Sequence, residues 1–373
     1  MKREWKEYKL GDVINFGNGK VRPTSKGEIP VYGGNGILDY TNQFNYDDDT
    51  IIIGRVGAYC GSVFFENRPI WVSDNALTAK PRLGFNSKFL YYYLKDLGLN
   101  QFAEGSSHPL VTQSLLNSIE VLIPDDHKEQ KIIAEILSSL DNKIDLLHRQ
   151  NKTLEQLAET LFRQWFVEEA DESWEVGTVE AEFDFVMGQS PKGSTLNEDQ
   201  NGMIFYQGRS DFGFRFPKER IYTTEPNRIA KKFDTLISVR APVGDMNMAI
   251  EECCLGRGVA AFRYKQNNLF YSYTYYKMRS LMNQIKQFED NGSVFGSIGK
   301  EDFKKLKNII PSDKLIIKFQ SEVKPIDDKI YSNTIQIKQL TQLRDALLPK
   351  LMSEEVRVNS SELTNSQDFY FLS

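Results

Sequence analysis

The strongest pattern of hydrophobic positions along the chain is a stripe that advances in alternating steps of three and four residues. It occurs once between residues 137 and 165 and again between residues 323 and 351. This spacing is typical of a coiled-coil seam and extends over about four heptads in each segment. The seam positions are Leu137, Leu140, Ile144, Leu147, Asn151, Leu154, Ala158, Leu161 and Trp165 in the first segment and Val323, Ile326, Ile330, Asn333, Ile337, Leu340, Arg344, Leu347 and Leu351 in the second.

A narrow apolar stripe on a helix has to be buried against another surface. Because the two stripes match in length, we expect the two helices to pair with each other; the alternative is that each helix packs on its own domain. The polar residues Asn151, Asn333 and Arg344 within the seams would then help to fix the register. Pro325 is expected to start or kink the second helix.

The region before each helix has a different pattern, with short apolar runs separated by Gly and Asn. Examples are GEIPVYGGNGILDY, TIIIGRVGAYCGSVFF and PIWVSDNALTAK. Such runs predict strands joined by tight turns. Each region continues with a short aromatic helix and a strand that ends in Ile-Pro.

Three pairs of segments show that the chain is a duplication. DTIIIGRVGAYCGSVFF from Asp49 is similar to DTLISVRAPVGDMNMAI from Asp234, and GSSHPLVTQSLLNSIEVLIP is similar to GSVFGSIGKEDFKKLKNIIP. LDNKID at Leu140 is similar to IDDKIY at Ile326. The offsets are 185, 187 and 186 residues, so each copy is a domain with its own helix and not a short solenoid repeat.

The sequence therefore predicts an α+β fold with two β-rich domains and two long helices. The expected boundaries are 1–124 for the first β-rich domain, 125–170 for the central helix, 171–311 for the second β-rich domain, 312–358 for the distal helix and 359–373 for a disordered tail.

Composition adds three constraints. Of the 373 residues, 40% are hydrophobic and 26% are charged, which is typical of globular proteins. The chain has no run of about 18 apolar residues and no signal-peptide pattern at its start, so we expect a cytoplasmic protein without a membrane span. Cys60, Cys253 and Cys254 do not suggest a disulfide framework.

The charge is distributed unevenly. The formal net charge is −5, which argues mildly against a nucleic-acid partner. The excess of acidic residues falls mainly on residues 125–170, whereas residues 1–124 and 171–311 are balanced. Each β-rich domain can therefore still present one basic face.

The sequence shows no catalytic centre. It lacks a phosphate-binding loop, a HExxH zinc motif and the Asn-Pro-Pro-aromatic motif of amino-methyltransferases. Asp313, Glu322 and Lys324 imitate the carboxylate and lysine pattern of metal-dependent nucleases, and a nuclease remains an alternative. These residues lie in the helical segment, however, where charged side chains usually form a solvated face.

Several segments resemble the specificity subunit of type I restriction-modification systems. The central helix, VLIPDDHKEQKIIAEILSSLDNKIDLLHRQNKTLEQLAETLFRQWFVE, and the distal segment, QLRDALLPKLMSEEVRV, carry the resemblance most strongly. EWKEYKLGDV and DTIIIGRVGAYCGSV are also similar to family members. The resemblance covers nearly the entire chain.

The resemblance implies a non-catalytic DNA-recognition subunit. Each β-rich region would be a target recognition domain that reads one half of a split site in double-stranded DNA, and the helices would pair antiparallel as a spacer. Two modification subunits would supply adenine methylation, and translocase-nuclease subunits would join for restriction. S-adenosylmethionine, ATP and magnesium would belong to those partners. The other alternative is a coiled-coil adaptor that does not bind DNA.

Two recognition domains on one spacer suit half-sites about one helical turn, roughly 34 Å, apart. The residues that read bases do not follow from the resemblance, so we selected them by chemistry. Arginine and lysine suit guanine, asparagine and glutamine suit adenine, and glycine turns allow close backbone approach. The DNA-binding candidates are Lys20, Arg22, Gly34, Asn35, Arg55 and His108 in the first copy and Lys192, Gln207, Arg209, Arg240 and Lys300 in the second. Arg55 and Arg240 occupy near-equivalent positions of the repeat, which suggests either a shared reading role or a shared structural salt bridge.

Overall fold

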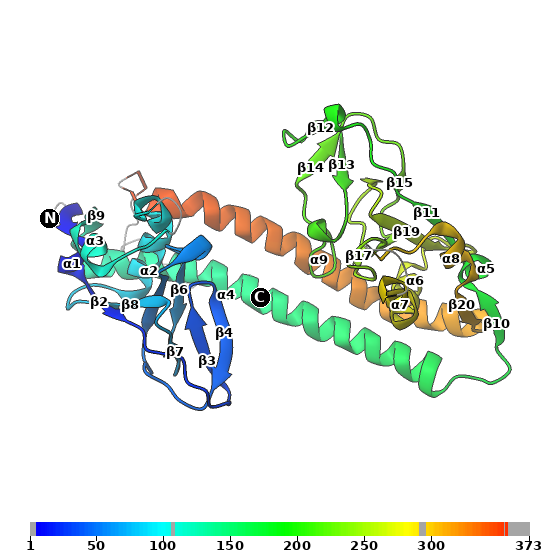
Figure 1. Ribbon diagram of the computed structural model, residues 1–373, viewed down its shortest axis with the longest axis horizontal. Helices are drawn as coiled ribbons and strands as arrows, with labels where there is room; N and C mark the ends of the chain where they lie inside the picture. The colour runs from blue at the N-terminus through cyan, green and yellow to red at the C-terminus, as the bar shows by residue number, and fades with distance from the viewer. Residues whose placement is uncertain (1–4, 106–108, 291–295, 354, 357–373) are drawn as a thin grey trace, which may run out of the picture. The chain divides into compact units, whose positions relative to one another are not determined.

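The chain forms two compact units. The computed structural model describes residues 5–105, 109–290, 296–353 and 355–356. Unit 1 takes its described residues from Met1–Leu147 and Ile335–Ser373, and unit 2 from His148–Thr334. The long helices α4 (His127–Arg163) and α9 (Asp313–Leu351) each contribute to both units (Figure 1).

Unit 1 contains two sheets and a separate strand pair. The larger sheet is antiparallel with the order β2-β8-β5-β6, and its central strand β5 is buried along its whole length because TIIIG has no charged residue. The second sheet, β4-β3-β7, contains one parallel pair, β3 with β7. Strand β1 pairs with β9. The strands are β1 (Trp5–Lys9), β2 (Ile14–Asn18), β3 (Ile29–Gly33), β4 (Gly36–Thr41), β5 (Thr50–Gly54), β6 (Val63–Glu66), β7 (Trp71–Val72), β8 (Ala76–Pro81) and β9 (Glu120–Pro124).

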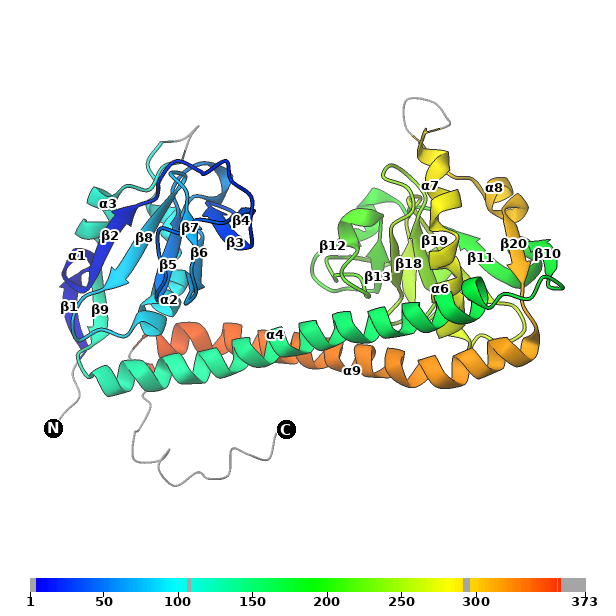
Figure 2. The same ribbon diagram turned by 90° about the horizontal axis from the view of Figure 1, so that it is seen from below.

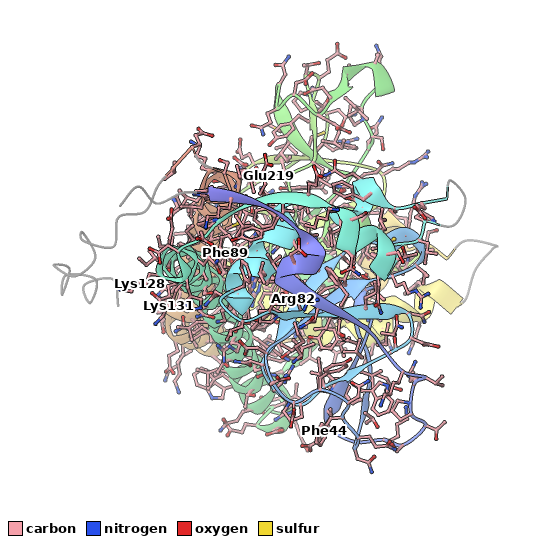
Figure 3. The ribbon with its side chains drawn as sticks, turned by 90° about the vertical axis from the view of Figure 1, so that its left-hand side faces the viewer. Phe44, Arg82, Phe89, Lys128, Lys131 and Glu219 are labelled. Carbon is pink, nitrogen blue, oxygen red and sulfur yellow. The ribbon has the colours of Figure 1, made fainter. Side chains whose placement is uncertain are left out.

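Short helices complete unit 1. The aromatic helix α2 begins after Asn86, whose side chain accepts a hydrogen bond from the Phe89 N–H and caps the first turn. Phe89 is buried in the unit core, whereas Lys128 and Lys131 lie on the exposed face of α4 (Figure 3). The helices are α1 (Leu10–Val13), α2 (Ser87–Asp96) and α3 (Gln113–Ser118), with short 3-10 turns η1 (Gly57–Tyr59) and η2 (Leu99–Phe102).

Unit 2 repeats this topology with additional strands. Its antiparallel sheet has the order β11-β19-β16-β17, and its second sheet has the order β12-β14-β13-β18-β15 with one parallel pair, β13 with β18. Strand β10 pairs with β20. The strands are β10 (Glu175–Thr178), β11 (Phe183–Met187), β12 (Leu196–Asn197), β13 (Met203–Tyr206), β14 (Ile221–Thr223), β15 (Ile229–Ala230), β16 (Thr235–Ser238), β17 (Met246–Met248), β18 (Cys253–Leu255), β19 (Val259–Tyr264) and β20 (Lys307–Ile310).

The core of unit 2 is rich in aromatic side chains. Tyr273, Tyr275 and Tyr276 of α6 are buried, and they join a cluster with Phe162 of α4 and Phe319 of α9. The helices are α5 (Val179–Glu182), α6 (Tyr271–Ser280), α7 (Met282–Asp290) and α8 (Lys300–Lys305), with the π-helical turn η3 (Gln164–Glu168) after α4 and 3-10 turns η4 (Gly193–Thr195) and η5 (Arg209–Asp211).

The two long helices pack together in antiparallel orientation, as Figures 1 and 2 show. In unit 2, the Asn333 amide donates to Asn151 Oδ1 at 2.9 Å in the buried seam. In unit 1, Arg344 Nη1 donates to Asp141 Oδ1 at 2.8 Å. From Asn333 to Arg344 along α9, the contacted residue of α4 moves back from Asn151 to Asp141. The two helices therefore run antiparallel.

The helices also pack on the β-rich parts, so both packing arrangements considered for the seams occur. In unit 1, Ile133 and Leu137 of α4 and Leu351 of α9 belong to the core. In unit 2, Ala158 of α4 and Val323 of α9 do so. The remaining apolar seam positions other than Leu147 and Ile330 are only partly buried. Among them, Leu154, Leu161, Trp165 and Ile326 pack against the core of unit 2, and Leu347 packs against the core of unit 1.

The fold bears on the expectations for Pro325, the cysteines and a membrane span. Pro325 does not start the second helix, because α9 already begins at Asp313 and Pro325 lies in its interior. The three cysteines are free and buried. No helix in the described part of the chain combines the length and the apolar character needed to cross a bilayer.

Candidate nucleic-acid interface

A basic pocket in unit 2 contains three of the predicted DNA-binding residues. Gln207, Arg209 and Arg240 line a pocket of about 740 Å³ together with Arg257, which the sequence analysis did not select. All four side chains are exposed. Arginine and glutamine side chains that converge on one hollow suit recognition of base edges and phosphates.

The loop after β13 is held in place by a buried carboxylate. Asp211 Oδ2 accepts hydrogen bonds from the backbone N–H groups of Gln207 (2.7 Å) and Gly208 (3.3 Å). Arg220 forms an ion pair with the other oxygen of Asp211 at 2.5 Å. The backbone that carries Gln207 and Arg209 is therefore fixed, and their side chains remain accessible.

Arg257 lies in the turn between β18 and β19, next to this loop. Its backbone N–H donates to Ser190 Oγ at 3.3 Å. A side chain at the following residue, Gly258, would place a Cβ atom 2.5 Å from the carbonyl oxygen of Gln207. Glycine is therefore needed for the turn to approach the Gln207 loop. Arg257 stands between two glycines, and a glycine-rich turn with a polar side chain is the pattern by which we selected Asn35. The same pattern could have identified Arg257.

The arginines of the pocket differ in their charge partners. Arg209 forms an ion pair with Asp245. Neither Arg240 nor Arg257 has an ion pair with any residue that the structure describes. Two uncompensated guanidinium groups therefore face the pocket.

The repeat relation between Arg55 and Arg240 is shifted by one residue in the structure. Ile298 N–H donates to the carbonyl of Val239, and Val111 N–H donates in the same way to Arg55. Arg55 thus corresponds to Val239, and Arg240 corresponds to Val56. Successive residues of an extended segment point to opposite faces, so a shared role for the two arginines is wrong. Consistently, Arg240 is exposed, whereas Arg55 is half-buried with a buried Nε.

In unit 1, the turn between β3 and β4 holds Gly34 and Asn35. Gly36 has φ +84°, a left-handed conformation that favours glycine. Ser62 Oγ donates to the carbonyl of Gly34, and Asn35 is exposed. The β3–β4 turn therefore presents Asn35 on a fixed backbone.

The other candidates of unit 1 are not gathered in one pocket. Lys20 is exposed, and its backbone N–H donates to the carbonyl of Val72 at 2.9 Å. Arg22 forms an ion pair with Asp39, which Lys26 also contacts at 2.8 Å. Hydrogen bonds from Lys26 and Arg22 hold the pKa of the Asp39 carboxyl well below its usual range. Arg22 is thus partly neutralised, and His108 lies outside the described residues.

Two candidates of unit 2 do not line the pocket. Lys192 is exposed directly before η4, and Lys300 is exposed as the first residue of α8. Both remain available for backbone phosphates, but neither joins the arginines.

The residues of the nuclease alternative do not form a metal site. Lys324 is paired with Asp328 on the next turn of α9 at 2.5 Å. Within the described part of the chain, no three His, Cys, Asp or Glu side chains are arranged to hold a metal ion.

Comparison with known proteins gives a consistent result. The model of the type I restriction modification DNA specificity domain matches residues 2–156 and 171–342. The type I restriction enzyme MjaIX specificity subunit of Methanocaldococcus jannaschii is 25% identical over 95% of this chain and 94% of its own length. The EcoprrI specificity subunit of Escherichia coli is 30% identical over 37% of this chain and 36% of its own length.

A solved structure shares the fold. The type I restriction-modification S subunit from M. genitalium matches with a TM-score of 0.68 and 21% identity, covering 95% of this chain and 98% of that one. With the family model matching both halves of the duplication, the chain belongs to the type I restriction-modification specificity subunits, which recognise DNA for a complex whose catalytic activities reside in other subunits.

Proposed function

We propose that unit 1 and unit 2 each read one half of a bipartite DNA site and that α4 and α9 set the spacer between the half-sites. The same sheet topology occurs in both units, which supports two DNA-reading domains with the same architecture. The antiparallel seam supports a spacer, because Asn151 and Asn333 fix how the helices are aligned. Half-sites about one helical turn apart, roughly 34 Å, suit two readers of this kind.

The observation that carries this proposal is the pocket of unit 2. Gln207, Arg209, Arg240 and Arg257 converge there despite the net charge of −5. Asp211 holds the loop beneath them, so base contacts would need little reordering of the backbone. Preorganised contacts favour affinity because less conformational entropy is lost on binding.

We further propose that two modification subunits dock on the helices. Leu146 and Leu157 of α4 and Leu343 of α9 lie outside the seam and are 42%, 49% and 48% exposed. Exposed leucines on helix surfaces provide apolar area for a partner. In this assembly S-adenosylmethionine would bind the modification subunits, and ATP and magnesium would bind the translocase-nuclease subunits. The nuclease and adaptor alternatives do not fit the family.

The test is methylome sequencing of a host that carries this gene and its modification-subunit gene, with the host lacking this gene as control. We expect methylated adenines in one bipartite motif that disappears without this chain.

In the same host, Arg240→Ala should relax or weaken one half-site only, with a loss of about 1–3 kcal/mol of discrimination for a two-pronged arginine–guanine contact. A uniform loss over both half-sites would identify Arg240 as structural. A motif without two halves would contradict the proposal.

A further inference from the structure

The two reading surfaces can be compared position by position, because the backbone hydrogen bonds define their register. Gly256 N–H donates to the carbonyl of Tyr206 in unit 2, and Ser73 N–H donates to the carbonyl of Tyr32 in unit 1, both at 2.8 Å. The bridges Arg240–Ser297 and Val56–Leu110 provide a second pair of equivalent positions. Arg240 and Arg257 of unit 2 therefore correspond to Val56 and Asp74 of unit 1. Arg209 and Asn35 each lie three residues beyond the matched tyrosines, Arg209 in η5 and Asn35 in the β3–β4 turn.

The matched positions of unit 2 are cationic. Arg209 is held by Asp245, whereas Arg240 and Arg257 are exposed and without an ion pair among the described residues. A guanidinium group can donate two parallel hydrogen bonds, which match O6 and N7 of guanine in the major groove. The neighbouring Gln207 adds a neutral donor and acceptor.

The matched positions of unit 1 are neutral, apolar or acidic. Val56 is 40% exposed, and Asn35 and Asp74 are also exposed. An asparagine amide matches N6 and N7 of adenine, and an apolar side chain packs against the thymine methyl group. Asp74 cannot donate to guanine and repels phosphate. Lys20, whose counterpart in unit 2 is Gln189, is an exposed cation near this surface.

The surface around β4 in unit 1 also exposes several apolar side chains. Along and beyond β4, Ile37, Leu38, Tyr40 and Phe44 are 41%, 46%, 48% and 53% exposed. Phe44 lies at the outer edge of the unit in Figure 3. The reading surface of unit 1 thus differs from that of unit 2 at the matched positions, and exposed apolar side chains lie beside it.

We infer that the two units read different kinds of base pair: Arg240 and Arg257 of unit 2 read guanine, and Asn35 and Val56 of unit 1 read an A·T pair. This inference rests on the proposed function. The duplicated backbone supplies equivalent positions, and the side chains at those positions supply different hydrogen-bonding and apolar groups.

The test uses the full chain in complex with its modification subunit and a duplex library randomised at every position of the wild-type motif. Methylation in vitro followed by sequencing gives the base preference of Asn35→Ala, Val56→Ala, Arg240→Ala and Arg257→Ala. We expect Arg240→Ala and Arg257→Ala to lose roughly 10- to 100-fold of discrimination at G·C positions of one half-site. Asn35→Ala and Val56→Ala should lose discrimination at an A·T pair of the other half-site.

Two further variants separate base reading from charge. Arg257→Lys keeps the positive charge but not the two-pronged geometry, so it should bind the motif nearly as tightly as the wild type and accept other bases. Lys307→Ala removes an exposed cation on β20, outside the pocket, and should leave every preference unchanged. If Arg257→Lys keeps full discrimination, or if Asn35→Ala relaxes a G·C position, the inference is wrong. A wild-type complex that shows no bipartite motif would instead overturn the proposed function.

Discussion

Arg215 is the largest fully buried side chain of the described residues and connects the β-rich part of unit 2 to both long helices. Its guanidinium group lies 3.3 Å from Glu155 of α4 and 3.2 Å from Asp327 of α9. It also donates to Tyr276 Oη at 2.7 Å and stacks 3.8 Å from the ring centroid of Tyr275. This buried network fixes the segment that follows the loop after β13 onto the helices.

We expect Arg215→Met to lower the free energy of unfolding by about 3–5 kcal/mol, because it leaves the buried Asp327 carboxyl without its cation. Glu155 keeps its ion pair with Arg279. Burial raises the pKa of Asp327, and Arg215 opposes that effect. Without Arg215 the folded-state pKa rises further above the unfolded value. A carboxyl group whose pKa is higher in the folded state stabilises the fold at low pH, and this contribution is lost as pH increases. The loss in free energy of unfolding caused by Arg215→Met should therefore be smaller at pH 5 than at pH 8.

Urea unfolding of both proteins at the two pH values measures this difference. Arg228→Met, which removes an exposed arginine of the same unit, is the control and should change stability little. A deficit that is equal at both pH values would mean that Asp327 does not take up a proton when Arg215 is absent.

The sequence did not reveal Arg215 for a physical reason. It lies between η5 and β14, where unit 2 is longer than unit 1, so no repeat partner marks it. An isolated arginine in a loop is usually exposed, and only the folded structure shows that acidic residues from two distant helices surround it. Arg240, which we selected as a DNA-binding candidate, lines the pocket of unit 2. Its expected repeat partner was displaced by one position, because sequence similarity alone does not determine strand register.

At the scale of elements, the helices were the most predictable part of the molecule. The heptad pattern located both helices, and the polar seam residues Asn151 and Asn333 do contact each other. Arg344 was also expected to fix the register, and its hydrogen bond to Asp141 provides such a contact. What the heptad pattern did not predict is the additional packing of Phe162 and Phe319 on the aromatic helix α6, because those residues lie outside the seam.

The Asn151–Asn333 pair should determine register at a cost in stability. We expect Asn151→Leu to destabilise the chain by about 1–3 kcal/mol, because the buried Asn333 amide loses its 2.9 Å hydrogen bond to Asn151. The double variant Asn151→Leu with Asn333→Leu should be more stable than the wild type, since both polar groups are then replaced. Urea midpoints compare the three proteins. A single variant as stable as the double would show that the two amides do not depend on each other.

At the scale of the whole molecule, the assignment of the catalytic activities to other subunits is directly testable. We expect the purified chain alone to neither methylate nor cleave DNA, with or without magnesium, because the catalytic activities of this family belong to other subunits. The assay combines the chain with plasmid DNA carrying the motif, and addition of modification subunit and S-adenosylmethionine should restore methylation. Magnesium-dependent cutting that is lost in Glu322→Ala would revive the nuclease alternative.

The duplication also predicts how half of the molecule should behave. A fragment from Glu172 to Ser373 retains the second β-rich domain and α9 but lacks α4. Its exposed stripe should drive association, and a second α9 can occupy the place of α4, which makes a two-fold dimer. With modification subunit, such a dimer should methylate an inverted repeat of one parental half-site.

The register shows where this dimer is imperfect. Residues of α4 correspond to residues of α9 that lie 186 positions later, and the hydrogen-bonded pairs Tyr92–Asp141 and Tyr276–Asp327 support this match. In the wild-type fragment, Asn151, Glu155 and Ala158 would therefore be replaced by Ile337, Thr341 and Arg344 of the second copy.

Each replacement disturbs the packing of unit 2. Asn333 would lose its amide partner, Arg215 would lose a carboxylate, and a large cation would enter the fully buried site of Ala158. We therefore expect the wild-type fragment to dimerise weakly and the triple variant Ile337→Asn, Thr341→Glu, Arg344→Ala to dimerise at least tenfold more tightly, because a shift of about 1.4 kcal/mol is a tenfold change in Kd. Sedimentation equilibrium of both fragments measures the difference, and methylome sequencing shows whether the methylated site is an inverted repeat. If the triple variant dimerises no better than the wild-type fragment, the second α9 does not occupy the register of α4.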